Sequence, residues 1–234
     1  MSDSTTHSLG LGIATSNSKA EIIEVFYPRP IITPEPALVG VFTDACAIEP
    51  GQNSVCEINS ELAASLCAKL TQAGFADHAE QLQQMSAGDQ KVILCLLGTD
   101  SAPDSVAEAY LKLHLLSHCL AKPHSLNLQG LFAVLHNIAW TNEGAVDLPE
   151  LADRQLAARL RGETLEVASV DKFPKMTNYV VPNGVRIAHT ARVRLGAYLG
   201  SGTTVMHEGF VNFNAGTEGP AMIEGRISAG VMIG

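Results

Sequence analysis

Basic side chains are scarce in this sequence of 234 residues. It contains 15 lysines and arginines against 24 aspartates and glutamates, which gives a net charge of −9. Proteins that bind nucleic acid usually carry a basic surplus that neutralises phosphate groups. The composition therefore argues against a nucleic-acid-binding protein, and an anionic small ligand would need a local basic patch.

Long hydrophobic runs are also missing. The longest apolar stretches, such as VILCLLG at 92–98, are far shorter than the roughly 20 residues that span a bilayer. The N-terminal stretch MSDSTTHSLGLGIATSNSKAE has neither a basic segment followed by an apolar one nor the arginine-rich pattern of a transit peptide. These absences predict a cytoplasmic protein with no membrane partner.

Cysteine is infrequent and is not arranged in pairs. The five cysteines are Cys46, Cys56, Cys67, Cys95 and Cys119, and no two of them have Cys-x-x-Cys spacing. This pattern excludes a zinc ribbon. It predicts reduced, mostly buried thiols, as in cytosolic proteins.

The first part of the chain, residues 1–168, predicts an α/β domain. Hydrophobic residues make up 46% of the sequence and charged residues 17%, which is enough apolar material for a core. Apolar periodicity and end signals predict three helices: 59–73, begun by Asn59 or Ser60 and ended by Gly74; 101–120, with Ser101 as cap and Pro103 in the first turn; and 147–161, with a capping-box-like pair Asp147 and Glu150 and Gly162 past its end. Short β-branched or aromatic runs predict strands at 22–28, 38–45 and 165–170.

After a connector at 169–180, the period of the sequence changes to six. Aliphatic residues recur at Val181, Ile187, Val193, Leu199, Val205 and Val211; Thr217 breaks the row, and Ile223 and Ala229 resume it. The residue four places after each is small, or at most valine, up to Ala221, and only Ile227 is large. Steps of six cannot stay on one face of a helix with 3.6 residues per turn, and they are typical of a parallel β-helix with three hexapeptides per coil. The pattern therefore predicts that residues 181–234 are the start of such a domain. Because the sequence stops in mid-coil, the 234 residues are expected to be a truncated, N-terminal fragment of a longer protein.

Three stretches resemble one known family. They are AEAYLKLHLLSH, VDKFPKMTNYVVPNGVRIA and GTTVMHEGFVNFNAGTEGPAMIEGRISAGVMIG, and they resemble the longer branch of the tetrahydrodipicolinate N-succinyltransferases, the hexapeptide-repeat acyltransferases with an α/β N-terminal domain. The resemblance implies a left-handed β-helix and homotrimers with active sites between neighbouring β-helices. It also implies transfer of succinyl from succinyl-CoA to the amino group of ring-opened tetrahydrodipicolinate, in lysine and diaminopimelate biosynthesis.

The resemblance also implies roles for three charged residues. Glu224 matches the catalytic glutamate, which in relatives is assigned a covalent acyl-anhydride, Arg226 matches a substrate-binding arginine, and Glu208 matches a magnesium ligand. Ala191 stands where some relatives have an aspartate, so magnesium would need three copies of Glu208 at a trimer axis. The residues agree in part, because a guanidinium suits a carboxylate and because Glu224 and Arg226, two positions apart, are expected on one strand face.

Other side chains leave alternatives open. The backbone amides of NFNAGTEG, 212–219, are candidate donors near the thioester. Arg186, Arg192 and Arg194 form either a basic strip for CoA phosphates or ordinary salt bridges. His114 and His118 have a spacing that can bind metal, but the leucines around them favour a packed helix, and Trp140 is interpreted as a packing anchor.

Two alternative functions accompany the succinyltransferase. One is a metalloenzyme of the γ carbonic anhydrase type, which needs three histidines on zinc, whereas the coil region offers only His189 and His207. The other is a non-catalytic β-helix that serves as a trimerisation scaffold. Because later coils complete the CoA site in the family, residues 1–234 alone are expected to release little CoA.

Overall fold

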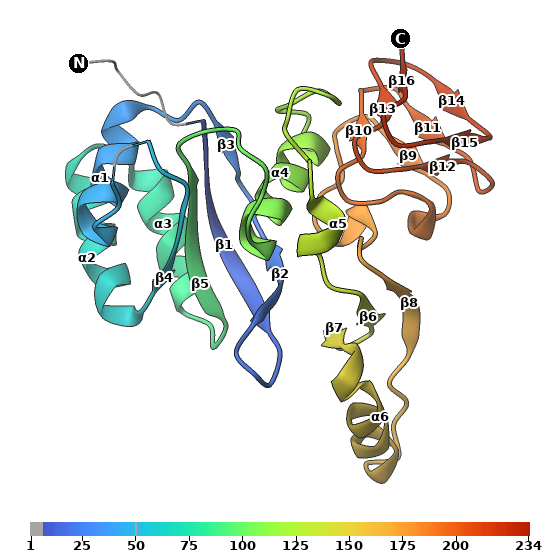
Figure 1. The fold of residues 1–234 in the computed structure, drawn as a ribbon, viewed down its shortest axis with the longest axis horizontal. Helices are drawn as coiled ribbons and strands as arrows, with labels where there is room; N and C mark the ends of the chain where they lie inside the picture. The colour runs from blue at the N-terminus through green and yellow to red at the C-terminus, as the bar shows by residue number, and fades with distance from the viewer. Residues whose placement is uncertain (1–6, 50) are drawn as a thin grey trace.

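The computed structural model describes residues 7–49 and 51–234. Figure 1 shows an α/β domain at one end, a stack of short strands at the other and a narrow arm that projects between them.

The α/β domain is built on an antiparallel sheet with the order β2-β1-β5-β4, and β3 also pairs with β1. Its strands are β1 (Ser8–Ser16), β2 (Ile22–Phe26), β3 (Ile31–Ile32), β4 (Ser54–Ile58) and β5 (Lys91–Leu97). Helices α1 (Pro36–Cys46), α2 (Ser60–Gln72) and α3 (Ala76–Ser86) cover one face, and α4 (Val106–Ser117) covers the other (Figure 1). Two hydrophobic cores result, one on each side of the sheet.

The predicted helix at 59–73 and the strand at 22–28 are confirmed with small changes of bounds. The side chain of Asn59 accepts a hydrogen bond from the Leu62 amide at 2.8 Å, and Gly74 follows the helix with a φ of +89°. The strand predicted at 38–45 is wrong, because this segment lies in α1. Pro36 starts that helix, and Leu38 and Phe42, four positions apart, are both buried on the sheet.

Two predicted helix starts need correction. Helix α4 begins at Val106 with Ser105 as its cap, and Ser101 and Pro103 precede it. The third helix, α6 (Leu151–Leu160), follows the short 3-10 helix η1 (Leu148–Glu150) and has no side-chain cap. Asp147 and Glu150 do not form a capping box there, because they instead accept hydrogen bonds from the Asn17 side chain and the Ser18 amide.

Helix α4 is buried on every side, although its sequence predicts a single apolar face. All of its residues are buried, including Lys112, His114 and Ser117. The reason is that α4 lies between the sheet and the coils. The Ser117 hydroxyl accepts from the Gly196 amide at 2.8 Å and donates to the Ala197 carbonyl at 3.1 Å, which joins the α/β domain to the coils.

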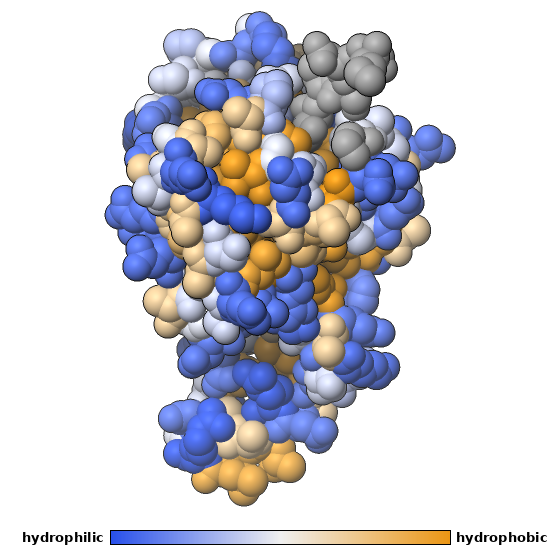
Figure 2. Space-filling model, turned by 90° about the vertical axis from the view of Figure 1, so that its left-hand side faces the viewer, coloured by the Kyte–Doolittle hydropathy of each residue, from blue (hydrophilic) through white to orange (hydrophobic). Residues whose placement is uncertain are grey.

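The arm follows the short helix α5 (Leu131–Val134) and contains a small sheet with the order β7-β6-β8. Its elements are β6 (Ile138–Thr141), β7 (Gly144–Asp147), α6 and β8 (Val167–Asp171), the last of which confirms the strand predicted at 165–170. Only Ala158 of α6 is buried, whereas Leu156 and Leu160 are exposed. In Figure 2 hydrophobic side chains gather at the lower tip of the molecule, where the arm ends.

The C-terminal part winds as a parallel β-helix with three short strands per coil. Its strands are β9 (Arg186–Ile187), β10 (Tyr198–Leu199), β11 (Thr204–Val205), β12 (Phe210–Val211), β13 (Gly216–Thr217), β14 (Met222–Ile223), β15 (Arg226–Ile227) and β16 (Met232–Ile233). They stack in parallel columns with the orders β9-β11-β14, β12-β15 and β10-β13-β16, and Val193 bridges to Val211 at the start of the second column. The predicted six-residue repeat is therefore confirmed from Ile187 to Ile223.

The two ends of the aliphatic row are corrected by the structure. Val181 is 58% exposed and lies outside the stack. At the other end Ile227, and not Ala229, points inward and pairs with Val211. The cause is a turn of two residues between β14 and β15, where the preceding coil has four between β11 and β12.

Thr217 also keeps its place in the row, although it is polar. It is fully buried, and its hydroxyl lies 2.6 Å from that of Thr203 inside the coil. The threonine is therefore compatible with the interior because it finds a hydrogen-bonding partner there.

The cysteines are all free, but only Cys95 is buried, so the expectation of mostly buried thiols is wrong; the other four are partly exposed. Within residues 7–49 and 51–234, no helix has the length and apolarity that crossing a membrane requires.

Candidate functional site

Three residues that the sequence singles out lie along one edge of the coils. Glu208 lies in the turn between β11 and β12, Glu224 in the turn between β14 and β15, and Ala191 in the 3-10 helix η3 (Thr190–Arg192), which occupies the same corner of the first coil. Because the coils stack in register, the structure brings these positions together on one corner.

Glu224 and Arg226 do not share a strand face, so that prediction is wrong. Glu224 belongs to the two-residue turn, and Arg226 is the first residue of β15. Both side chains are exposed, and within the described residues Glu224 makes no hydrogen bond or ion pair. A single chain therefore does not enclose Glu224, and the family resemblance places the cleft between neighbouring β-helices.

The Arg226 guanidinium lies over an aromatic ring. Its central carbon is 5.1 Å from the centre of the Phe210 ring, and its Nε is 3.4 Å from the Ser228 hydroxyl. Phe210 pairs with Arg226 in the β12–β15 column, which fixes this arrangement. The outer edge of the guanidinium carries donors suited to a carboxylate.

Glu208 already has a cationic neighbour. Arg192 Nη2 lies 3.2 Å from Glu208 Oε2, and His207 Nε2 lies 3.7 Å from Oε1, with all three side chains largely exposed. Within the described ranges no three His, Cys, Asp or Glu residues come close enough to hold a metal ion. One carboxylate paired with arginine does not fit Mg²⁺, which needs several oxygen ligands.

The backbone amides predicted as donors are mostly engaged. Those of Asn212, Asn214, Gly216 and Glu218 donate to carbonyls of neighbouring turns and coils, and that of Phe213 donates to the Asn212 side chain. The prediction for 212–219 is therefore wrong for these five amides, because stacking of the coils consumes them.

Two of the three arginines of the predicted strip make salt bridges. Besides the Arg192–Glu208 pair, Arg194 Nη2 contacts Asp171 Oδ2 at 2.5 Å and Nη1 donates to Asn212 Oδ1 at 3.0 Å. The central guanidinium carbon of Arg194 also lies over two rings, 5.3 Å from the centre of Phe173 and 5.7 Å from that of Phe210. In the described part of the chain Arg186 makes no ion pair, so ordinary pairing accounts for two of the three.

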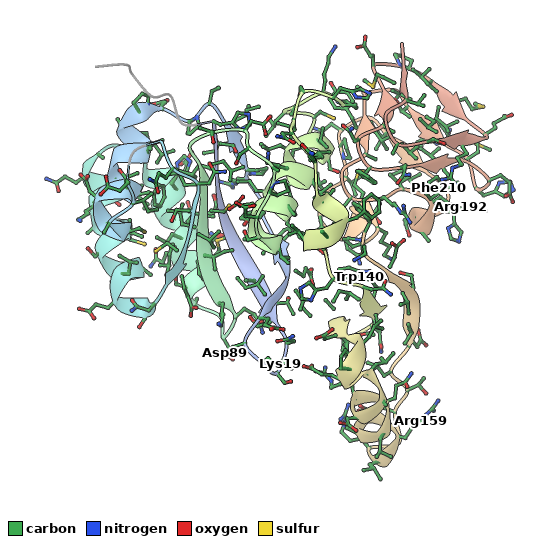
Figure 3. All side chains as sticks on the ribbon, in the orientation of Figure 1. Lys19, Asp89, Trp140, Arg159, Arg192 and Phe210 are labelled. Atoms are coloured by element: carbon green, nitrogen blue, oxygen red, sulfur yellow. The ribbon has the colours of Figure 1, made fainter. Side chains whose placement is uncertain are left out.

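A cavity of about 350 Å³ lies between the arm and the first coil. Its lining includes Trp140, Asp171, Phe173, Lys175, Arg194 and Phe210, and it also reaches Ala191 at the corner. In Figure 3 Trp140 lies where the arm begins, while Phe210 and Arg192 lie on the edge of the coils that faces it. Trp140 is buried and donates its indole N–H to the Asp171 carbonyl at 2.9 Å, so its predicted packing role is confirmed, but it also borders this cavity.

Comparison with known proteins bears on both halves of the chain. Residues 65–133 match the family model described as tetrahydrodipicolinate N-succinyltransferase N-terminal, and residues 135–175 match the one described as tetrahydrodipicolinate N-succinyltransferase middle. Proteins named 2,3,4,5-tetrahydropyridine-2,6-dicarboxylate N-succinyltransferase are similar over almost the whole chain. That from Pseudomonas putida is 54% identical over 98% of the chain, that from Pseudomonas aeruginosa 56% over 97%, and that from Vibrio cholerae 53% over 97%.

The chain belongs to the tetrahydrodipicolinate N-succinyltransferase family. It spans 66%, 65% and 66% of the length of these three relatives. A crystal structure from Campylobacter jejuni, described as a candidate 2,3,4,5-tetrahydropyridine-2-carboxylate N-succinyltransferase, superimposes with a TM-score of 0.88 at 26% identity and covers 99% of this chain and 65% of that one. The Campylobacter jejuni structure therefore has the α/β domain, the arm and the coils in the same order as this chain.

This family fold also buries titratable groups far from the corner. Burial lowers the pKa of His114 to about 3, although its hydrogen bond to the Tyr110 carbonyl acts in the opposite direction. The other ring nitrogen accepts from the Tyr27 amide at 3.2 Å, so the imidazole is neutral and structural, as the leucine-rich sequence predicts. Burial also raises the pKa of Glu24, whose carboxylate accepts from the Tyr179 hydroxyl at 2.7 Å.

Lys175 and the cavity beside it are not predictable from the sequence. The residues of the lining come from the arm, from 173–178 and from the first two coils. The only local signal was a second lysine in DKFPKM, which gives no indication of which side chains lie opposite it.

Proposed function

We propose that the protein containing this chain transfers succinyl from succinyl-CoA to the amino group of ring-opened tetrahydrodipicolinate, in lysine and diaminopimelate biosynthesis. Family membership and identities of 53–56% to proteins of that name support the proposal. The single structural observation that carries it is the stacked corner, where Glu224 is exposed and has no competing partner among the described residues, two positions before Arg226 in the chain.

In this proposal Glu224 is the catalytic carboxylate and Arg226 binds a substrate carboxylate. The amine nitrogen attacks the thioester carbonyl, the C–S bond breaks, and an amide and the CoA thiol form. The amine loses a proton to Glu224, and Glu224 then gives a proton to the leaving thiolate, which becomes the CoA thiol and returns the carboxylate to its starting state. Arg226, held against Phe210, orients the acceptor so that its nitrogen reaches the thioester.

The assembly in this proposal is a cytoplasmic homotrimer of left-handed β-helices. Residues 1–168 form the N-terminal domain, 169–180 the connector and 181–234 the start of the acyltransferase domain. The exposure of Glu224 in one chain, and the exposed Leu156 and Leu160 of α6, support completion of the cleft by a second copy. Magnesium would require Glu208 from three copies, and no step of the reaction is assigned to it, because the ligands of one chain do not fit the ion.

The test is release of free CoA by the full-length protein in the presence of succinyl-CoA and the acceptor. Glu224→Gln should lower kcat by roughly a hundredfold or more, because it removes the proton acceptor. Glu218→Gln, an exposed glutamate of another corner paired with Lys122, is the matched control and should stay near the wild-type rate. A near-normal rate for Glu224→Gln would remove Glu224 from the mechanism.

Inactivity of the wild-type full-length protein would instead favour the trimerisation scaffold. Residues 1–234 alone should release little CoA in the same assay. Strong turnover by this chain would contradict the expectation that later coils complete the CoA site.

A further inference from the structure

Two cationic side chains face each other across a short antiparallel bridge beneath the cavity. Lys175 is paired with Arg194, and the flanking hydrogen bonds run from the Met176 amide to the Val193 carbonyl and from the Leu195 amide to the Pro174 carbonyl, both at 2.9 Å. Hydrogen bonds on either side of two opposite residues, and none between those two residues, identify a non-hydrogen-bonded antiparallel pair. In such a pair the two Cα atoms lie closer together than in a hydrogen-bonded pair. Its two side chains leave the same face with the shortest separation that such strands allow.

Like charges directly opposite each other destabilise a pair of strands. Here only one of the two is neutralised, since Asp171 contacts Arg194. Within the residues that the structure describes, Lys175 has no carboxylate in ion-pairing distance. The pair therefore keeps one uncompensated positive charge beside a cavity that both residues line.

The guanidinium of this pair is held in a fixed orientation. Its central carbon lies over the Phe173 and Phe210 rings, and Asp171 and Asn212 each take one of its five N–H donors. Three donors are left over, and a guanidinium fixed in this way loses little freedom when it binds a planar anion. The lining contains one other carboxylate, that of Glu166. Glu166 lies five positions before Asp171, so that the extended chain separates the two residues by up to about 16 Å.

We propose that this cavity is a carboxylate-binding site in which Lys175 supplies the unpaired cation and Arg194 the oriented guanidinium. Its volume of about 350 Å³ is within the range of small-molecule pockets. Phe210 connects it to the corner, because Arg194 and Arg226 both lie over that ring. The assignment of the carboxylate to a substrate rests on the proposed function, under which it belongs either to the acceptor or to the succinyl group of the donor.

Trp140 can serve as a fluorescent probe of binding in the cavity, because it is the only tryptophan of the sequence and it lines the cavity. Titration of the 234-residue chain with pimelate and with succinate should change the Trp140 fluorescence in a saturable way. The dimethyl esters of the two acids, which carry no charge, should produce no saturable change. Absence of a saturable response to both acids would overturn the proposal.

Lys175→Met should weaken binding of the acid by roughly tenfold or more, the loss expected for a charge-assisted contact. Lys175→Arg should restore most of the affinity, since it returns the positive charge. Lys91→Met, which removes a lysine paired with Glu57 on the distant sheet, controls for net charge and should remain within about twofold. Equal affinities for Lys175→Met and Lys91→Met would overturn the assignment of Lys175.

Kinetics of the full-length protein then identify which substrate supplies the carboxylate. If the acceptor supplies it, Lys175→Met raises the KM of the acceptor and leaves that of succinyl-CoA unchanged. If the succinyl group supplies it, the KM of succinyl-CoA rises and discrimination against acetyl-CoA falls. Unchanged KM values for both substrates in an active enzyme would overturn the link to catalysis, whereas an inactive wild-type enzyme would overturn the proposed function and leave the binding result intact.

Discussion

Helix α4 and the interior of the coils beside it are both buried, but they are buried by different means. Every residue of α4 lies inside the molecule, and several of them are polar. The Lys112 ammonium contacts Asp100, the Ser101 carbonyl at 2.6 Å and the Asn127 carbonyl at 2.9 Å. The interior of the coils is instead made of aliphatic side chains, with Met176 and the buried Thr203–Thr217 pair as its other members.

The difference concerns what each region depends on. Helix α4 depends on individual side chains that match individual partners, so its stability responds to pH and to single polar changes. The coils depend on a backbone that returns to the same position every turn, so they respond to any atom that interferes with close approach of successive turns. Substitutions in the two regions test this contrast.

The largest effect is expected for Gly216→Ala in the coils. A Cβ atom at Gly216 would lie 1.7 Å from the Tyr198 carbonyl oxygen of the preceding coil, and backbone atoms cannot move aside without breaking the column. We expect a loss of roughly 3–5 kcal/mol in the free energy of unfolding, measured by denaturant titration. Gly219→Ala is the control, because nothing lies within 4 Å of its added Cβ. Similar stabilities of the two variants would contradict the dependence on backbone spacing.

A smaller effect on the free energy of unfolding, which originates at His114 in α4, is expected on acidification. Burial holds the pKa of His114 at about 3, below its unfolded value of 6.5, so the unfolded chain binds the proton first as the pH falls. The stability contributed by neutral His114 is complete above pH 6.5 and is lost progressively below it, by about 2 kcal/mol at pH 5. Denaturant titrations at pH 7 and 5 should show this loss in the wild type.

His114→Gln isolates this contribution from other titrating groups. Glu24 acts in the opposite sense, since its raised pKa gives stability that is lost as the pH rises. The wild-type loss minus that of the variant should therefore approach the share of His114. An unchanged pH dependence in His114→Gln would show that the buried imidazole does not limit acid stability.

The smallest effects are expected for the threonine pair in the coil. Thr203 also bonds the Gly200 carbonyl at 2.7 Å, whereas the Thr217 hydroxyl has Thr203 as its partner among the described residues. Thr203→Val leaves the Thr217 hydroxyl unpaired and should cost about 1–2 kcal/mol in unfolding free energy. Thr217→Val restores the aliphatic row and should change stability by less than about 0.5 kcal/mol. The reverse order would mean that Thr217, and not Thr203, organises the pair.

Sequence periodicity was a reliable guide where one physical repeat governs the structure. The step of six located the coils from Ile187 to Ile223, because each inward position is generated by the same backbone turn. It failed at Ala229, where the turn with Glu224 and Gly225 is two residues shorter than its counterpart. Nothing in the spacing of the aliphatic residues reveals the length of one turn.

Local propensity was less reliable in the α/β domain. Residues 38–45 contain β-branched and aromatic side chains that favour a strand, yet Leu38 and Phe42 pack as helical neighbours on the sheet. Likewise, the expected capping box at Asp147 and Glu150 is replaced by contacts to Asn17 and Ser18, which are distant in sequence. In both cases the competing partner comes from another part of the chain.

The sequence by itself determined the α/β half, the change to a six-residue coil and the family to which the chain belongs, because periodicity and long local motifs are properties of contiguous residues. Only the tertiary structure decided that Glu224 and Arg226 lie on a turn and a strand, that Glu208, Glu224 and Ala191 share one corner, and that Lys175 faces Arg194 beside a cavity. The physical reason is that these relations depend on turn length and on which segments pack together, and neither is encoded in the spacing of any single stretch.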